Sequence, residues 1–172
     1  MFNFFYKKNK KTIIKLDLNK PILEKDSQNI EKIQNETKDF FENSKKYKVY
    51  WTRHYEIIDK IRFELYSKAI NEENIHNNYA EECIKLGYED LNLAPVIIEY
   101  WKEEARIRKE EYKPLNYGSH IYLLKLLEKQ QRYEEAINVC NEYIKLGLTN
   151  DGTKGGIVKR KEKLIQLNKK ED

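Results

Sequence analysis

The sequence predicts an all-α fold in which helical hairpins stack side by side and a C-terminal helix caps the stack. Residues 22–86 contain neither glycine nor proline, so this half of the chain lacks the turn residues that a β-hairpin fold needs. Apolar side chains recur at steps of three and four residues along most of the chain, which is typical of amphipathic helices. Only 40% of the residues are apolar and 36% are charged, so each helix must keep one face in water.

The length of 172 residues suits one domain with a contiguous core. We expect residues 1–26 to form a basic segment that is extended or disordered, and residues 27–172 to form a single helical domain. Residues 12–18 alternate apolar and polar side chains without a partner strand, and the first helical pattern begins at about Ser27. From there one stripe runs to Phe41, and we expect a break at 43–44.

A stronger stripe from Tyr47 to Ala69 predicts one long helix. The polar turn that follows should cap the next helix through Asn74, and that helix should end at Gly87. Pro95 then suits the first turn of a further helix, because a proline there removes no intrahelical hydrogen bond.

A short repeat supports a stacked architecture. Residues 84–87 and 144–147 both read Ile-Lys-Leu-Gly. We expect each copy to end the second helix of a hairpin, because glycine commonly follows the last turn of a helix. The two copies therefore favour a helical-repeat protein.

Residues 118–148 contain the motif that suggests a family. Its positions are Leu123 and Leu127 in the first helix, the stretch 133–137 (Tyr-Glu-Glu-Ala-Ile) and the stretch 143–146 (Tyr-Ile-Lys-Leu) in the second. This pattern resembles a tetratricopeptide repeat. The resemblance implies paired antiparallel helices that approach closely at the small Ala136, and a short solenoid of stacked hairpins.

The chain departs from the family at the turn and near the start of the repeat. Gln131 stands where the family has a turn glycine, and His120 stands where it has an aromatic residue. Residues 154–168 are predicted to form the capping helix that a repeat protein needs at its end. In that helix Ile157, Val158, Leu164 and Ile165 should cover the exposed seam, while Lys159, Arg160 and Lys163 should face water.

The resemblance also places a candidate binding surface. In such a repeat the first helix lines the inner surface of the solenoid, and here it presents Tyr122, Lys125, Glu128 and Lys129. Lys125 and Lys129 lie one helical turn apart, which suits an acidic peptide. We therefore regard these four residues as candidate partner-binding residues.

The charge distribution offers a second surface. Residues 1–25 carry a net charge of +5, residues 153–172 carry +4, and the stretch between them carries −5. Lys154, Arg160 and Lys163 at the basic C-terminal end are weak candidates for anion binding, together with the glycine-containing loop at 151–156. Basic ends and thirteen tyrosines would also suit phosphates and bases, although the acidic middle argues against nucleic acid.

Residues that carry catalysis or bind metal are scarce. His54, His76 and His120 form no pair at a recognised metal or nucleophile spacing, and Cys83 and Cys140 lie too far apart for a metal motif. We expect both cysteines to be reduced core residues. The sequence therefore predicts a protein that is not an enzyme and has no cofactor and no metal.

These observations predict a non-catalytic protein–protein interaction module, or adaptor, that binds a protein or an acidic peptide through a helical groove. One alternative is a nucleic-acid-associated protein. The other is a small inhibitor, of phage or host-defence type, that occludes a larger partner. We expect a cytoplasmic protein with no membrane segment, because no apolar run approaches the ~20 residues that span a bilayer; the oligomeric state is left open.

Overall fold

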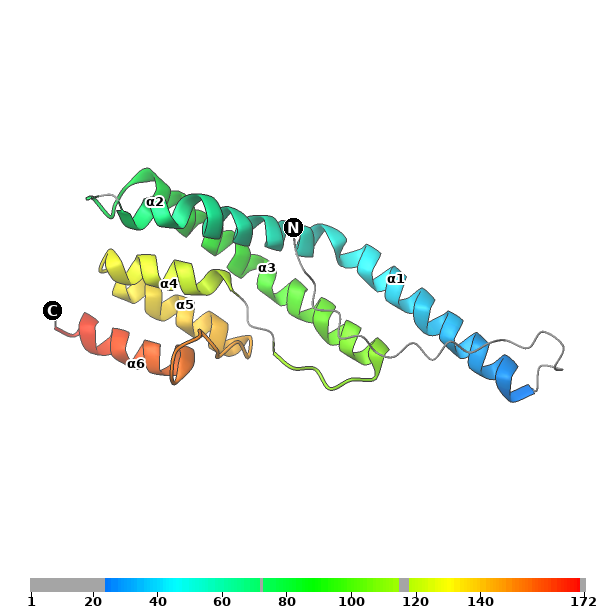
Figure 1. Cartoon of the computed structure of the whole chain (residues 1–172). Coiled ribbons are helices and arrows are strands. Elements are labelled where there is room, and N and C mark those ends of the chain that lie inside the picture. The colour runs from blue at the N-terminus through cyan, green and yellow to red at the C-terminus, as the bar shows by residue number, and fades with distance from the viewer. Residues whose placement is uncertain (1–23, 72, 115–117, 171–172) are drawn as a thin grey trace. The chain divides into compact units, whose positions relative to one another are not determined.

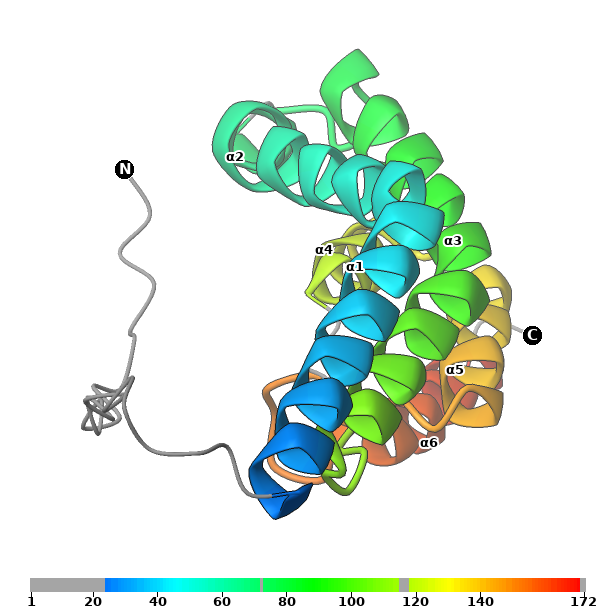
Figure 2. The ribbon, with the colours of Figure 1, turned by 90° about the vertical axis from the view of Figure 1, so that its right-hand side faces the viewer.

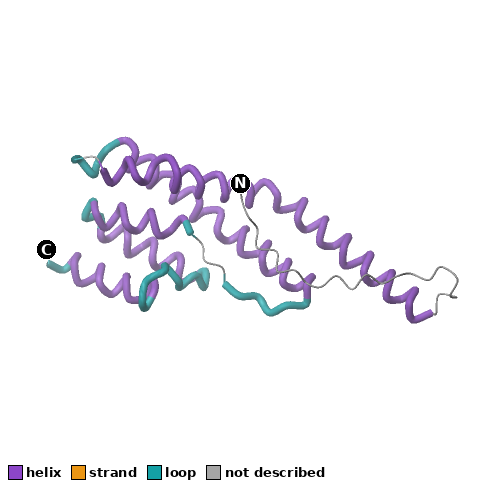
Figure 3. Tube along the Cα trace, in the orientation of Figure 1, coloured by secondary structure: helices purple, strands orange, loops and turns teal. Residues whose placement is uncertain are grey.

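The computed structural model describes residues 24–71, 73–114 and 118–170. Every regular element in these ranges is helical, which confirms the prediction of an all-α chain (Figures 1 and 3). The expected basic segment at 1–26 lies almost wholly outside the described residues. The elements are α1 (Glu24–Asp59), the π-helical turn η1 (Lys60–Leu65), α2 (Tyr66–Asn71), α3 (Asn78–Arg108), α4 (Ser119–Lys129), α5 (Tyr133–Lys145) and α6 (Gly156–Asn168).

The chain divides into two compact units, residues 1–35 and 36–172. The described part of the first unit is the opening of α1, in which Ile33 is exposed. The second unit contains the rest of α1 and all of the later helices. The contacts discussed below all lie within this second unit.

Within the second unit, α1 runs antiparallel to α3 (Figure 2). The buried Asn43 side chain donates a hydrogen bond of 3.0 Å from Nδ2 to Oε1 of Glu104. One turn later the ring of Tyr47 lies 5.7 Å from the ring of Tyr100. The predicted break at 43–44 is therefore wrong. An asparagine side chain favours a turn when it forms hydrogen bonds with the nearby backbone. Here the side chain of Asn43 bonds to Glu104 of α3 instead, and the helix continues.

The prediction that Gly87 ends a helix is also wrong, because α3 continues through it. Gly87 is buried where α3 crosses α4, and a Cβ at this position would lie 2.9 Å from Cβ of Leu123. Glycine is used here for close helix approach. The second copy of the repeat differs, because Gly147 follows α5 with a left-handed φ of +75°.

Pro95 lies inside α3 and not in a first turn, which is a second correction to this region. A proline in a helix interior costs about 3 kcal/mol, because it lacks the N–H that the preceding turn would bond. Pro95 itself is exposed, but Ala94, Ile97 and Ile98 around it are buried. Burial of each isoleucine contributes about 1.5–3 kcal/mol, so the packing of this stretch outweighs the cost of the proline.

The N-terminal cap of α3 is Asn77 and not the expected Asn74. The side chain of Asn77 accepts a hydrogen bond of 2.9 Å from the amide of Ala80, as an N-cap residue does. Asn74 instead accepts from the amide of His76 and so shapes the preceding turn. Asparagine is a favoured N-cap residue at either position. Asn77 lies three residues before Ala80, the first buried residue of α3.

Helices α4 and α5 form a hairpin within the predicted range 118–148. Ala136 on α5 is fully buried. Gln131, at the position of the family's turn glycine, adopts a left-handed φ of +59°. The amide of Arg132 donates to the carbonyl of Leu127 at 2.9 Å and closes the turn, so hydrogen bonding compensates for a conformation that favours glycine.

Helix α6 packs on α5 through the fully buried Ile157 and Leu164. Two of its residues were placed wrongly from the sequence. Val158 is 44% exposed and not on the seam. Arg160, expected in water, has a side chain only 10% exposed, because it forms ion pairs that are described below.

Helices α2, α4 and α6 lie one after another in the second unit, with α3 and α5 behind them (Figure 1). The ring of Tyr66 on α2 lies 4.8 Å from the ring of Tyr122 on α4. On the other flank of α4, Glu128 pairs with Arg160 of α6. These contacts bring three helices that are separate in the sequence to one shared surface.

A first prediction concerns the crossing of α3 and α4. Gly87→Ala should gain about 1 kcal/mol of helix propensity but lose about 1–3 kcal/mol by overpacking. The clash involves Cβ of Leu123, which cannot move without its backbone, so we expect a net loss of stability in chemical denaturation. Gly118→Ala is the matched control, because no atom lies within 4 Å of its added Cβ; equal midpoints for the two variants would contradict the close crossing.

Candidate functional site

The candidate binding surface is centred on α4. Tyr122 contacts α2 on one flank and Glu128 contacts α6 on the other. Lys125 and Lys129 follow Tyr122 by three and seven residues, so at 3.6 residues per turn they lie between these flanks. We call this surface the α4 face and define it by Tyr66, Tyr122, Lys125, Lys129 and Lys163.

The aromatic part of the α4 face is the pair Tyr66 and Tyr122. Their rings meet edge to face at an interplanar angle of 65°, and both side chains are half-buried. Burial, followed by the neighbouring Tyr122, raises the pKa of Tyr66 above its ordinary value. The phenol is therefore neutral at physiological pH, and the pair offers an apolar surface with polar edges.

Lys125 and Lys129 form the basic part. Both side chains are exposed, and neither has an ion-pair partner among the described residues. Their charges are therefore available to solvent and to a partner. The structure places these two residues and Tyr122 together, and their role in binding remains a prediction.

Glu128 is placed differently from the other candidates. Its side chain is only 19% exposed and accepts from Arg160, while Nζ of Lys163 lies 3.9 Å from its second oxygen. Nε of Arg160 also donates to Oδ2 of the buried Asp151 at 2.6 Å. This cluster joins α4, α6 and the intervening loop, so Glu128 and Arg160 hold the surface together.

The loop before α6 contains part of the predicted anion-binding site. Lys154 is exposed in this loop. The amide of Ile157 donates to the carbonyl of Thr149 at 2.9 Å, and the amide of Gly156 donates to that of Thr153 at 3.1 Å. These amides are therefore occupied, and of the three basic candidates only Lys154 and Lys163 keep an exposed charge.

Asp151 has a low pKa for a buried carboxyl group. Burial alone would raise its pKa, but hydrogen bonds from Thr153 and Arg160 favour the charged form more strongly, and the pKa lies below its ordinary value. The ion pair with Arg160 is consequently maintained across the physiological pH range. This keeps α6 against the loop and against Glu128.

A buried polar cluster that sequence reasoning missed lies behind the α4 face. The carboxylate of Asp90 on α3 is fully buried. Its Oδ1 accepts a hydrogen bond of 2.7 Å from Nδ1 of His54 on α1, and its Oδ2 accepts from the hydroxyl of Ser119 on α4. One carboxylate thus ties three helices together, and only the position of Asp90 within an apolar stripe hinted at this role.

The order of groups in this cluster is not that of a hydrolytic triad. In a triad the imidazole lies between the serine hydroxyl and the carboxylate and takes the proton of the serine. Here Asp90 lies between Ser119 and His54, so the hydroxyl donates to the carboxylate and not to the imidazole. The cluster is a structural hydrogen-bond network.

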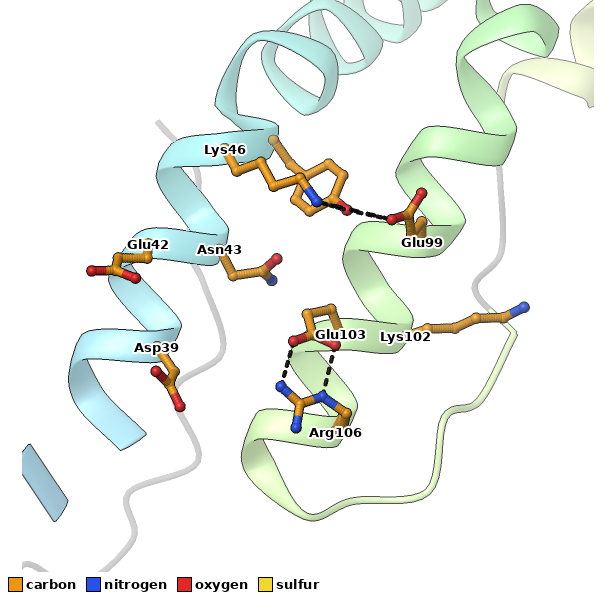
Figure 4. A pocket seen from close by; sticks show the side chains of 9 residues that line it. Asp39, Glu42, Asn43, Lys46, Glu99, Lys102, Glu103 and Arg106 are labelled. Atoms are coloured by element: carbon orange, nitrogen blue, oxygen red, sulfur yellow. Dashed lines mark hydrogen bonds and ion pairs between the residues drawn. The ribbon is translucent and has the colours of Figure 1, made fainter. Parts of the chain in front are cut away.

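A polar pocket of about 640 Å³ lies between α1 and α3 (Figure 4). Its charges largely neutralise one another: Arg106 makes hydrogen bonds of 2.6 and 2.8 Å to Glu103, and Nζ of Lys46 lies 4.0 Å from Glu99. A ligand would have to break these pairs to bind. The lining consists of Asp39, Glu42, Asn43, Lys46, Tyr47, Glu99, Lys102, Glu103 and Arg106.

The cysteines and the remaining histidines are distributed through the fold. Burial raises the pKa of the Cys83 and Cys140 thiols to about 12, so neither is a reactive thiolate. His76 is exposed and His120 is fully buried. Within the described ranges, no three histidine, cysteine or carboxylate side chains are grouped as metal ligands would be.

No helix in the described residues combines the length and the apolar character needed to span a bilayer.

Comparison with known protein families, with curated proteins and with solved structures finds no match.

A second prediction tests the network behind the α4 face. Asp90→Ala should leave His54 and Ser119 without their shared acceptor and should cost about 3 kcal/mol or more, measured by chemical denaturation. Ser119→Ala is a milder variant, with an expected cost of about 1–3 kcal/mol. Glu89→Ala removes the adjacent carboxylate, whose ion pair with Arg53 is exposed, and should cost at most about 1 kcal/mol; a similar cost for all three variants would contradict the network.

A third prediction concerns pH. Burial lowers the pKa of His120 from 6.5 to about 4, so between these values the unfolded chain binds a proton that the folded chain does not. The contribution of neutral His120 to the free energy of unfolding should therefore be fully present above pH 6.5. It should decline as pH falls toward 4, by about 3 kcal/mol in total. Denaturation midpoints at pH 7.5, 6 and 5 should show a smaller decline for His120→Gln than for the wild type.

The matched control for this prediction is His76→Gln, because His76 is exposed. Its pH dependence should equal that of the wild type. An equal decline in the wild type and in His120→Gln would show that another group dominates the acid sensitivity.

Proposed function

We propose that the protein is a non-catalytic interaction module that binds an acidic segment of another protein through the α4 face. The observation that carries this proposal is the position of the exposed Lys125 and Lys129 beside the Tyr66–Tyr122 pair. Amphipathic aromatic rings are enriched in protein contact surfaces. Lysines beside them supply charge complementarity to carboxylates.

The ion pairs of Glu128 strengthen the basic character of this surface. Glu128 is the only acidic residue of α4, and its charge is satisfied by Arg160 and Lys163. An incoming carboxylate therefore meets the free ammonium groups of Lys125 and Lys129 without strong local repulsion. A short acidic peptide with one apolar or aromatic side chain has the chemistry to match.

The tetratricopeptide-like arrangement is part of the same proposal. Two features support it: the α4–α5 hairpin within the residues that resemble the repeat, and the side-by-side order of α2, α4 and α6. In such a stack the first helices of successive hairpins form the binding surface. The proposal assigns that surface to the α4 face and the role of end cap to α6.

The fourth prediction tests this function. Lys125→Glu together with Lys129→Glu should weaken capture of the native partner at least about tenfold, and the difference should shrink as salt rises. Partners would be recovered from the native cell extract, with and without nuclease, and their affinities measured with purified components. The circular dichroism spectrum of the variant should be unchanged, because both side chains are exposed.

The control reverses two exposed lysines of α3, Lys85→Glu and Lys102→Glu, which changes net charge by the same amount away from the α4 face. It should bind like the wild type. An equal loss of affinity in both variants would show that net charge, and not the α4 face, controls binding. Loss of the partner after nuclease treatment would replace the proposal with the nucleic-acid alternative.

A further inference from the structure

A stripe of exposed apolar residues follows the outer side of α1 and η1. It includes Phe41, which is 66% exposed, Val49 at 75%, Tyr55 at 47% and Phe63 at 63%. Large apolar side chains grouped on one face usually mark an interaction surface. None of these residues belongs to the α4 face.

The residues along this stripe follow the steps of four and three that keep one helix face toward a partner helix. In order they are Phe41, Lys45, Lys48, Thr52, Tyr55, Asp59 and Phe63, with Val49 and Glu56 beside them. The last step, from Asp59 to Phe63, lies in the π-helical turn, where a turn takes more residues than in an α-helix. The wider turn keeps Phe63 in line with the stripe.

The chemistry of this stripe is self-complementary about Thr52. A phenylalanine lies 11 residues before Thr52 and another 11 residues after it. Two lysines, Lys45 and Lys48, lie on one side, and two acids, Glu56 and Asp59, lie at the corresponding distances on the other. In a two-fold symmetric pair of antiparallel helices, each residue meets its mirror position on the partner.

We propose that this stripe is a homodimer interface in which α1 and η1 of two copies pack antiparallel, with Thr52 at the two-fold axis. Phe41 of one copy then packs on Phe63 of the other. The lysine pair meets the acidic pair twice, once on each side of the axis. A parallel arrangement would place lysine on lysine, so the charges select the antiparallel one.

The charged groups are able to make these contacts. Lys45 and Lys48 are exposed and have no ion-pair partner among the residues that the structure describes. Glu56 lies 3.4 Å from Arg53, but Arg53 is already held by hydrogen bonds of 2.7 and 3.0 Å to Glu89. Arg53 therefore keeps a partner when Glu56 turns to a second copy.

The size of the interface predicts a moderate affinity. The stripe from residue 41 to residue 63 spans about 33 Å at 1.5 Å per residue. An interface confined to one helix pair of this length falls at the low end of the sizes of specific interfaces, where weak and transient complexes are found. We therefore expect self-association in the micromolar range and not an obligate dimer.

This fifth prediction is tested by sedimentation of the full chain across a concentration series. Lys45→Glu with Lys48→Glu makes the whole stripe acidic, and Glu56→Lys with Asp59→Lys makes it basic. Each double variant alone should dimerise at least about tenfold more weakly than the wild type, because like charges then meet. An equimolar mixture of the two should form a heterodimer at least as tight as the wild-type homodimer.

A cross-linking variant locates the axis. Thr52→Cys should form an intermolecular disulfide under mild oxidation, because the two positions meet at the axis. The native cysteines do not interfere, since both are buried. His76→Cys is the control, because His76 is exposed but lies outside the stripe, and it should remain largely monomeric.

Three results would overturn the proposal. The wild-type chain could stay monomeric up to several hundred micromolar. The mixture of oppositely charged variants could fail to associate. Thr52→Cys could cross-link no faster than His76→Cys. Circular dichroism of each variant distinguishes a lost interface from a lost fold.

Discussion

The carboxylate of Asp90 is the constraint on which the arrangement of the helices depends. It is fully buried and bonds to His54 of α1 and Ser119 of α4. A buried charge without partners is very costly, so α1, α3 and α4 must keep the register that satisfies it. The hydrogen-bond geometry at this carboxylate tolerates only small shifts between these helices.

The same register determines where the α4 face lies. Ser119 is the first residue of α4, so its bond to Asp90 fixes the start of that helix. Close contact of Gly87 with Leu123 fixes the next turn. With both points set, α4 carries Tyr122 toward Tyr66 on one flank and Glu128 toward α6 on the other. The buried network and the exposed surface are therefore two sides of one helix.

The sequence predicted the elements of this fold better than their boundaries. Apolar periodicity indicated helices almost everywhere because it is a local property. Gly87 and Gly147 carry the same local sequence, but only a neighbouring helix at Gly87 makes glycine a packing residue there. Asn43 similarly suggests a turn from its local sequence, but in the fold its side chain donates a hydrogen bond to Glu104, which is distant in the sequence. Of the binding candidates, Lys125 and Lys129 could be placed from periodicity, whereas the burial of Glu128 and Arg160 required knowledge of α6.

Helix α3 runs without a break through two regions of the second unit, and its two halves pack against different sets of helices. Its first half packs on α4. Its last turns contact α1, through Tyr47–Tyr100 and Asn43–Glu104, and also the segment after α3, where Lys102 lies over the ring of Tyr112. In Figure 1 the end of α3 extends beyond α4, α5 and α6. We therefore expect backbone amides in the arm formed by α1 and the end of α3 to exchange with solvent through local openings of lower free energy than those of the stack. We expect this arm to fray and re-form while the α4 face stays intact.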